Sequence, residues 1–455
     1  MSRGKSKGLM KFTVIWFGQV VSLLGTGMTG FALTIWAWQL TGQATALALV
    51  GFFRFFPQVI MTPIAGALVD RCNRKLLMIL SDLAAGVATI AIFILYRTES
   101  LEIWHLYVTA AFAGTFGAFQ FPAYSASISL MLPKSQYTRA SAMLGLVQSI
   151  STVFAPIAAG ALLAFIGIGG ILTIDIATFL FAIGTLLVVS IPQPEATHVE
   201  QARRGKFLSD VFFGFDYIFA RPSLFGLLLF FLLVNMLLSF SGGVLSPMIL
   251  ARTGDNELIL GTVQMLFGIG GVAGGALVSI WGGPKRRILG LIGGVLVSTF
   301  IGNVLLGIGQ SLVVWSVGAI AAVLFIPLAS GASQSIWQSK VSPHLQGRVF
   351  SARIVIGQIG GAIALPLAGL LADHVFEPLM IGTSPLAAAL SHVVGSGRGA
   401  GMGLMFVLFG ILGGLATIAA YRFRPIREIE TILPDHDEAP SEEATPDADA
   451  AAKAA

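Results

Sequence analysis

Long apolar runs separated by short polar segments recur along almost the whole chain. Each run has about 20 residues or more, enough for a helix rising about 1.5 Å per residue to cross the roughly 30 Å hydrocarbon core of a bilayer. The pattern predicts an all-α polytopic membrane protein with twelve transmembrane helices. The expected spans are residues 11–40, 44–69, 76–96, 103–132, 138–167, 168–190, 224–250, 259–283, 286–310, 312–341, 348–380 and 397–423.

The composition excludes a soluble globular domain. Of the 455 residues, 55% are hydrophobic and 11% are charged, whereas about 25% are charged in an average soluble domain. The 54 glycines are typical of helices that approach one another closely in lipid. Cys72 is the single cysteine, so no internal disulfide can form.

The basic residues are distributed unevenly between the two sides of the predicted bundle. If the N-terminus lies inside, most Lys and Arg residues fall on the inner side. The main inner clusters are residues 3–11, 71–75, 203–206, 285–287 and 422–427. The outer loops hold only Arg97, Arg252 and Arg398. The positive-inside rule therefore predicts that both termini lie in the cytoplasm.

The two halves of the chain repeat one another. Aligned at an offset of 210, residues 133–158 and 343–368 are identical at seven positions, including Pro156 and Pro366. We therefore expect two pseudo-symmetric six-helix bundles in parallel orientation. The predicted domains are residues 1–190 for the N-terminal bundle, 191–222 for a cytoplasmic linker with an amphipathic helix, 223–425 for the C-terminal bundle and 426–455 for a disordered acidic tail.

The loop after the second predicted span, residues 66–75, reads GALVDRCNRK. It resembles the signature G-x-x-x-D-R-x-G-R-K of the major facilitator superfamily, with Asn73 in place of the last glycine. Its position between spans two and three, on the basic side, makes the match specific. Further motifs resemble the bacterial branch of macrolide-efflux and enterobactin-exporter-like proteins. They include Gly18-Gln19, Phe121-Pro122, Asp175-x-x-Thr178 and the run DHVFEP at residues 373–378.

The resemblance, which covers about residues 10–425, implies the major facilitator fold and a secondary exporter in the plasma (inner) membrane of a bacterium. It implies an amphipathic small-molecule substrate, protons and the lipid bilayer as partners, with no nucleic acid and a monomeric state. Classical drug/proton antiporters of the superfamily carry an arginine in helix 4, and residues 103–132 contain none. Helix 4 therefore gives no direct sign of proton coupling, and the coupling is expected by analogy with the family alone.

Four charged residues inside or near the spans are candidates for ion coupling: Arg54, Asp82, Asp175 and Asp373. A charge near the bilayer centre costs about 2.5–3.5 kcal/mol on insertion scales, which favours a functional reason for each. Arg54 would face a central cavity or pair with a neighbouring polar helix. Asp82 and Asp175 would carry a proton or serve as structural hydrogen-bond acceptors. Asp373, beside His374, would form a gate, a proton-entry pair or an interfacial hydrogen bond.

A second group of residues is expected to line a substrate cavity. Gln19, Ser22 and Thr26 recur at helical spacing and form a polar stripe along the first span. In the family that the chain resembles, helices 1, 4, 7 and 10 line the cavity. On those helices the further candidates are Phe116, Gln120, Asn235, Gln334 and Gln338. The alternative for each is interhelical hydrogen bonding or packing.

The loop at residues 66–75, which resembles the superfamily signature, predicts a conformational gate. Its members are Gly66, Asp70, Arg71, Arg74 and Lys75. Asp70 is expected to meet the partial positive charge at the start of the eleventh helix and to hold the halves together when the cavity opens outward. Gly66 would permit close backbone contact. The three basic residues would fix the aspartate, meet lipid, or only set the topology.

The first functional hypothesis is export of amphipathic organic compounds, such as macrolide-like drugs, by alternating access, with antibiotic resistance as the consequence. The alternatives are a siderophore exporter, a lysolipid flippase, and a non-transporting membrane sensor or assembly partner. The sequence contains no metal-ligand cluster, nucleotide-binding motif or catalytic triad. We therefore expect no enzyme activity, no metal and no cofactor.

Overall fold

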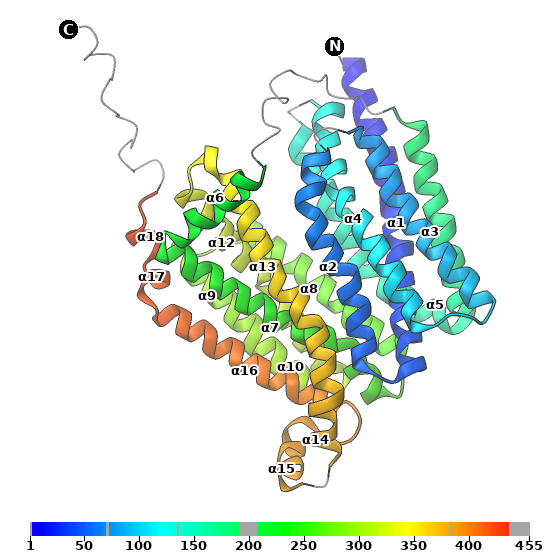
Figure 1. The fold of residues 1–455 in the computed structure, drawn as a ribbon, viewed down its shortest axis with the longest axis vertical. Helices are drawn as coiled ribbons and strands as arrows, with labels where there is room; N and C mark the ends of the chain where they lie inside the picture. The colour runs from blue at the N-terminus through cyan, green and yellow to red at the C-terminus, as the bar shows by residue number, and fades with distance from the viewer. Residues whose placement is uncertain (1, 70–71, 134–135, 191–206, 383, 436–455) are drawn as a thin grey trace.

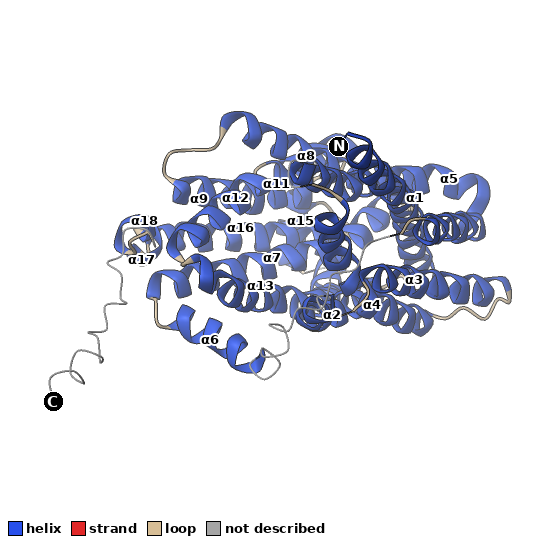
Figure 2. Cartoon of the chain, turned by 90° about the horizontal axis from the view of Figure 1, so that it is seen from above, coloured by secondary structure: helices blue, strands red, loops and turns tan. Residues whose placement is uncertain are grey.

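The computed structural model describes residues 2–69, 72–133, 136–190, 207–382 and 384–435. Within these ranges the secondary structure is helical throughout, without a strand (Figure 2). Ten of the described helices are long and apolar enough to cross a membrane. The prediction of an all-α polytopic membrane protein is therefore confirmed.

The N-terminal half consists of five helices by their hydrogen bonding. They are α1 (Ser2–Thr41), α2 (Ala44–Val69), α3 (Arg74–Arg97), α4 (Ile103–Met131) and α5 (Tyr137–Val188). The backbone of α5 breaks at Gly167, where φ is 63° and ψ is −177°. Glycine adopts a positive φ without the steric cost of a Cβ atom, so α5 divides there into the two arms predicted as spans five and six.

The C-terminal half follows a short helix, α6 (Phe207–Phe219), which packs against the outside of α13 (Figure 2). Its helices are α7 (Pro222–Thr253), α8 (Glu257–Trp281), α9 (Arg287–Leu296), the π-helix η3 (Val297–Gly302), α10 (Asn303–Ile308), α11 (Leu312–Leu324), α12 (Ile326–Lys340), α13 (Pro343–Leu371), the π-helix η4 (Ala372–Phe376), α14 (Glu377–Ile381), α15 (Pro385–Val394) and α16 (Ala400–Arg422). The twelve predicted spans all lie on helices of the two halves. The number of membrane crossings stays a prediction.

The two halves lie side by side and touch mainly through α2 against α13 and α5 against α8 (Figure 1). We call the end of the bundle where α1 begins the terminal end, and the opposite end the distal end. A Cβ atom on Gly369 would come within 2.5 Å of Thr45, and one on Gly160 within 2.9 Å of Glu257. These close contacts lie toward the distal end, whereas the ribbons of α2 and α13 diverge toward the terminal end (Figure 1).

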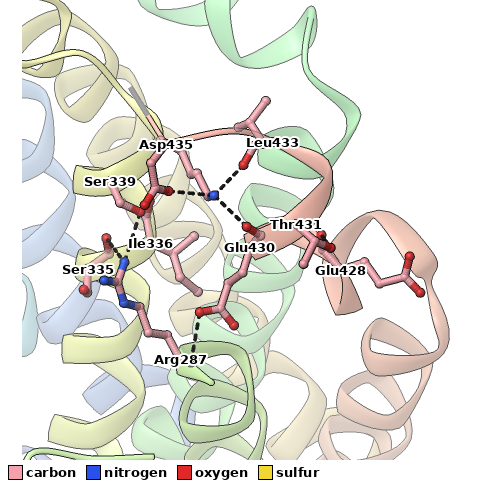
Figure 3. Close-up of polar contacts among 10 residues, drawn as sticks. Arg287, Ser335, Ile336, Ser339, Glu428, Glu430, Thr431, Leu433 and Asp435 are labelled. Carbon is pink, nitrogen blue, oxygen red and sulfur yellow. Dashed lines mark hydrogen bonds and ion pairs between the residues drawn. The ribbon is translucent and has the colours of Figure 1, made fainter. Parts of the chain in front are cut away.

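The segment after α16 corrects the prediction of disorder from residue 426. It continues as α17 (Arg424–Arg427) and α18 (Ile429–Ile432), with Ile426 and Ile429 buried. The ammonium group of Lys340 donates hydrogen bonds to the carbonyl oxygens of Glu430 and Leu433 and lies 2.7 Å from Asp435 (Figure 3). Apolar anchors and a buried cation therefore hold this segment, although its composition is polar.

Glu430 also fastens the segment to the start of α9. Its carboxylate accepts hydrogen bonds from the backbone N–H groups of Arg287, at 3.2 Å, and Ile288, at 3.3 Å. These N–H groups belong to the first turn of the helix, where they have no intrahelical partner. The Arg287 guanidinium in turn donates to the carbonyl oxygen of Ser335 and the hydroxyl of Ser339 (Figure 3).

Candidate functional site

The N-terminal half encloses a cavity of about 610 Å³ among α1 to α5. Three of its polar lining residues, Gln19, Ser22 and Thr26, form the stripe along α1. Arg54 on α2, Asp82 on α3 and Gln120 on α4 complete the polar wall. The structure therefore brings most of the coupling and cavity candidates of the N-terminal half to one cavity.

Asp82 is held between two amide side chains. The Gln19 Nε2 atom donates to Oδ2 of Asp82 at 2.8 Å, and the Gln120 Nε2 atom donates to Oδ1 at 2.9 Å. The same Gln120 nitrogen lies 2.6 Å from Oε1 of Gln19, which closes the triangle. The Oε1 atom of Gln120 is buried and has no hydrogen-bond partner. The carboxylate is thus coordinated by side chains that can both donate and accept.

Asp175, on the second arm of α5, lies in a separate cluster of hydroxyl groups. It accepts hydrogen bonds from Thr26 at 3.2 Å and from Thr89 at 2.8 Å. A Cβ atom on Gly25 would lie 2.9 Å from its Oδ1 atom, so this glycine lets α1 approach the carboxylate closely. Asp175 is 2% exposed, and its contacts turn it toward α1 rather than toward lipid.

Arg54 lies between the two clusters. It borders the large cavity and also a smaller one of about 100 Å³, which Thr26 and Thr89 line as well. Its side chain makes no hydrogen bond or ion pair with the described residues. Gly114 of α4 packs against the Arg54 carbonyl, since a Cβ atom there would lie 2.1 Å from that oxygen. The tight α2 and α4 contact therefore sets the depth at which this cation enters the cavity.

The C-terminal half has its own cavity of about 310 Å³. It is lined by Asn235 of α7 and Gln334 of α12, and their role in binding substrate stays a prediction. Arg353 of α13 lines it too and was not among the residues singled out from the sequence. Because α13 begins at Pro343 and not near residue 348, Arg353 lies ten residues into the helix, about 15 Å from its start. The Ser342-Pro343 pair is a helix-start signal that would have indicated this depth.

Two other candidates point elsewhere. The Phe116 ring packs on Phe112 with ring centroids 5.0 Å apart, while its carbonyl oxygen accepts a hydrogen bond from Ser81. Gln338 is exposed, and its backbone carbonyl accepts from Gln346 at 3.2 Å. Neither side chain borders the two cavities described above.

The gate loop is described only in part, because Asp70 and Arg71 lie outside the described residues. Arg74 donates to the carbonyl oxygen of Ala126 at 2.7 Å. Lys75 donates to two carbonyl oxygens at the end of α5, those of Leu187 at 3.1 Å and Val189 at 2.9 Å. Lys75 therefore binds helix-end carbonyls, where the helix dipole favours positive charge, whereas Arg74 binds a carbonyl inside α4.

Gly66 departs from its expected role in this conformation. A Cβ atom on Gly66 would meet nothing within 4 Å, so no helix packs closely there. The divergence of α2 and α13 at the terminal end is the physical reason (Figure 1). A close contact at Gly66 stays a prediction for the conformation in which this end closes.

At the distal end, Asp373 joins the two halves. Its carboxylate accepts hydrogen bonds from the backbone N–H groups of Ala44, at 3.0 Å, and Thr45, at 2.7 Å. These are the first residues of α2, a helix of 26 residues, so the anion meets unpaired donors and the positive end of the helix dipole. A second contact between the halves runs from the Trp38 indole to Asp255 at 2.7 Å.

Two further charged residues brace the distal end of the C-terminal half. Arg252 donates to four backbone carbonyls, those of Gly307, Gly309, Val394 and Gly399. Glu377 accepts from the N–H groups of Gly399 and Met402. The sequence GSGRG at residues 395–399 could have indicated this arrangement, because a glycine-rich loop leaves backbone groups that need partners from side chains.

The comparisons with known proteins agree with this architecture. The profile of the Major Facilitator Superfamily matches residues 15–365. Macrolide efflux protein A of Streptococcus pyogenes is 28% identical over 370 residues, which are 80% of this chain and 90% of that protein. Multidrug efflux pump Tap of Mycolicibacterium fortuitum is 25% identical, covering 79% and 88%. Enterobactin exporter EntS of Salmonella choleraesuis is 24% identical, covering 78% and 84%.

Solved structures share the fold. A bacterial homolog of the human lysosomal transporter Spinster, in an inward-facing and unoccupied conformation, superimposes with a TM-score of 0.65 and 15% identity, covering 90% of this chain and 97% of that chain. A transporter of the POT family superimposes with a TM-score of 0.67 and 12% identity, covering 91% and 96%.

Proposed function

Because this chain belongs to the Major Facilitator Superfamily, we propose that it is a secondary active exporter that moves amphipathic organic compounds out of the cytoplasm of a bacterium. The names of three relatives, a macrolide efflux protein, a multidrug efflux pump and an enterobactin exporter, support export as the direction. In this proposal the protein acts as a monomer in the inner membrane, coupled to protons, with its terminal end in the cytoplasm.

Alternating access explains why the hydrogen bonds and the tight helix contacts between the halves lie toward the distal end, while α2 and α13 diverge toward the terminal end. The Asp373 and Trp38 contacts hold the distal end together, whereas the cavities described above lie in the separate halves. With the terminal end in the cytoplasm, this arrangement is the inward-open state, ready to load substrate from inside. Export then requires the distal contacts to break and the terminal end to close.

The observation that carries proton coupling is the Asp82 triangle. Both carboxylate oxygens accept from amide groups, while the buried Oε1 atom of Gln120 has no donor. Protonation of Asp82 would create an O–H donor, and a half-turn of the Gln120 amide would present Oε1 as its acceptor. The half-turn breaks the hydrogen bond from Gln120 to Oε1 of Gln19, so the Gln19 side chain must move away as well. Proton binding would thus be coupled to a rearrangement of side chains on α1, α3 and α4, which line the cavity.

Efflux assays in a pump-deficient bacterial host test the function. Wild-type protein should lower the accumulation of a macrolide such as erythromycin, and a proton uncoupler should abolish the difference. If no tested amphipathic compound is extruded, the proposed export function is wrong. If extrusion is undiminished in the presence of the uncoupler, the proposed proton coupling is wrong.

The role of Asp82 is tested in everted membrane vesicles with a pH-sensitive dye. The Asp82→Asn variant should bind substrate but show no substrate-induced proton movement, because an asparagine side chain does not take up a proton in the pH range of the assay. Ser81→Ala is the matched control: it changes a neighbouring side chain that also lines the cavity and should retain proton movement. Normal proton movement in Asp82→Asn would redirect the assignment to Asp175.

A further inference from the structure

The cavity of the C-terminal half has a charge character unlike that of the N-terminal half. Arg353 is the cation on its wall, and Asn235, Gln334 and Gln358 are its neutral polar neighbours. No carboxylate lines this cavity, and within the described part of the chain Arg353 takes part in no ion pair. A cation inside a membrane-spanning helix costs free energy, so the absence of a paired carboxylate beside Arg353 calls for an explanation.

Neighbouring side chains hold the guanidinium in place. Its Nη1 atom donates to Oε1 of Gln334 at 3.0 Å, and its Nη2 atom donates to the hydroxyl of Ser333 at 3.1 Å. The guanidinium carbon lies 5.1 Å from the ring centre of Trp337, within the range of a cation–π contact. Ser333 and Trp337 are both fully buried. The cation is therefore positioned from behind by residues whose own places are set by packing.

The held guanidinium keeps donors for a ligand. A guanidinium has five N–H donors in a planar fork, and two of them are used by Gln334 and Ser333. The remaining donors suit an oxyanion, since the fork binds carboxylate, sulfonate or phosphate oxygens with two parallel hydrogen bonds.

The rest of the wall is apolar and aromatic. Phe231, Phe350 and Leu228 line the cavity beside the guanidinium. Such a surface buries a hydrophobic or aromatic body, while a single polar group fixes its orientation. Arg54, the other membrane cation, shares its cavity with Asp82 and is therefore less suited to a ligand anion.

We propose that Arg353 is the anion-recognition residue of the substrate cavity, and that the substrates bound there are amphipathic organic anions, with an aromatic or apolar body and one oxyanion group. This proposal rests on the transport function proposed above and narrows its substrate class. Under this proposal, the cavity of the C-terminal half binds an acidic aromatic compound in preference to a cationic macrolide.

The test uses two probes that differ by one group. Anilinonaphthalene sulfonate and phenylnaphthylamine share the same aromatic skeleton, and only the first carries a sulfonate. Binding to purified protein in lipid nanodiscs is measured by energy transfer from tryptophan to the probe, with Trp337→Phe identifying the signal from this cavity. Wild-type protein should bind the sulfonate more tightly than the neutral amine.

Arg353→Gln should weaken sulfonate binding by about tenfold or more, the usual effect of losing a hydrogen-bonded charge. Arg353→Lys should restore part of it, because lysine keeps the charge but lacks the fork. Unchanged binding of the neutral amine to Arg353→Gln verifies that the cavity is intact. The matched control Arg398→Gln removes another arginine that lies over a tryptophan ring, at the distal end, and should leave both affinities unchanged.

Equal affinities of wild-type protein for the two probes, or unaltered sulfonate binding in Arg353→Gln, would overturn the proposal. These are binding measurements, so they do not depend on transport. Failure of export in the host assay would refute the proposed function and leave the anion preference of the cavity standing.

Discussion

The two halves share a repeated sequence but differ in the charged groups that line their cavities. The N-terminal half places Asp82 in its cavity, with Asp175 in a hydroxyl cluster nearby and Arg54 between them. The C-terminal half has Arg353, held by neutral side chains and without a carboxylate on the cavity wall. The difference suggests a division of labour, in which one half handles the proton and the other orients the substrate.

The terminal ends of the halves differ in the same way. In the N-terminal half, Arg74 donates to the Ala126 carbonyl inside α4, and Lys75 donates to carbonyls at the end of α5. In the C-terminal half, Arg287 donates to the Ser335 carbonyl inside α12, while the carboxylate of Glu430 binds the start of α9. Lys75 and Glu430 therefore compensate helix dipoles, and in the C-terminal half the compensating group comes from the segment after α16.

The largest expected effect comes from Arg54. Arg54→Ala should reduce transport of every substrate by about tenfold or more, because it removes the cation that lies between the Asp82 and Asp175 clusters. Arg54→Lys should restore transport only in part. By contrast, Arg353→Gln should impair anionic substrates alone. Transport of one neutral and one anionic probe, measured in parallel, checks this prediction. If both variants lose transport of both probes equally, the proposed division of labour between the halves is contradicted.

The next effect concerns the distal contact between the halves. Asp373→Asn should favour opening of the distal end, because the amide cannot offer two anionic acceptors to Ala44 and Thr45. A charge at a helix start contributes about 0.3–1 kcal/mol, and up to about 2 when partly buried, so the equilibrium should move roughly two- to thirtyfold. Distances between spin labels at the distal ends of α2 and α13 measure the shift.

Asp70 provides the opposite case at the terminal end. Asp70→Asn should increase the population in which the terminal end is open. Ser279→Ala should change little: Ser279 follows the run GALV at residues 275–278 just as Asp70 follows the run GALV at residues 66–69. The same spin-label method, applied to the terminal ends of α2 and α13, measures this. If both aspartate variants shift the equilibrium in the same direction, the two contacts do not oppose each other.

A smaller effect is expected from Lys340. Its side chain is 2% exposed and donates to two carbonyls of the segment after α16. Lys340→Met should lower the free energy of unfolding by about 1–3 kcal/mol, because buried acceptors lose their donor. Thermal unfolding of the purified protein measures it. Arg424→Gln removes an ion pair with Glu428 in which the arginine side chain is 76% exposed, so it should leave the melting temperature nearly unchanged.

The smallest effect is a dependence on acid pH. Lys340 holds the pKa of Asp435 below its ordinary value of 3.8. The folded state therefore binds this proton less tightly than the unfolded state, so the contact stabilises above pH about 3.8 and is lost as the pH falls below it. A fluorescent label on the segment after α16 should report loosening only in that range. Asp435→Asn should remove the dependence, and loosening near neutral pH would contradict the assignment.

Much of the helical arrangement could be predicted from the sequence, because long apolar runs have few options in a membrane other than helices. All twelve predicted spans lie on helices, and even the break at Gly167 falls at a predicted boundary. The eleventh predicted span began at residue 348, whereas the helix that carries it, α13, begins at Pro343. Arg353 was therefore not singled out, because a residue near a helix end looks like a topology signal, whereas one ten residues inside does not.

The sequence alone determined the fold class, the family resemblance and the charged residues that deserved attention, since these depend on composition and on local patterns. Only the tertiary structure decided which charges meet. Asp373 finds its partners 328 and 329 positions away along the chain, and Asp82 lies between amides from two other helices. Helical periodicity tells which side chains share a face, but it does not tell which helix packs against that face. The helix-to-helix packing therefore decided where the proposed proton site, the proposed anion site and the distal contact lie.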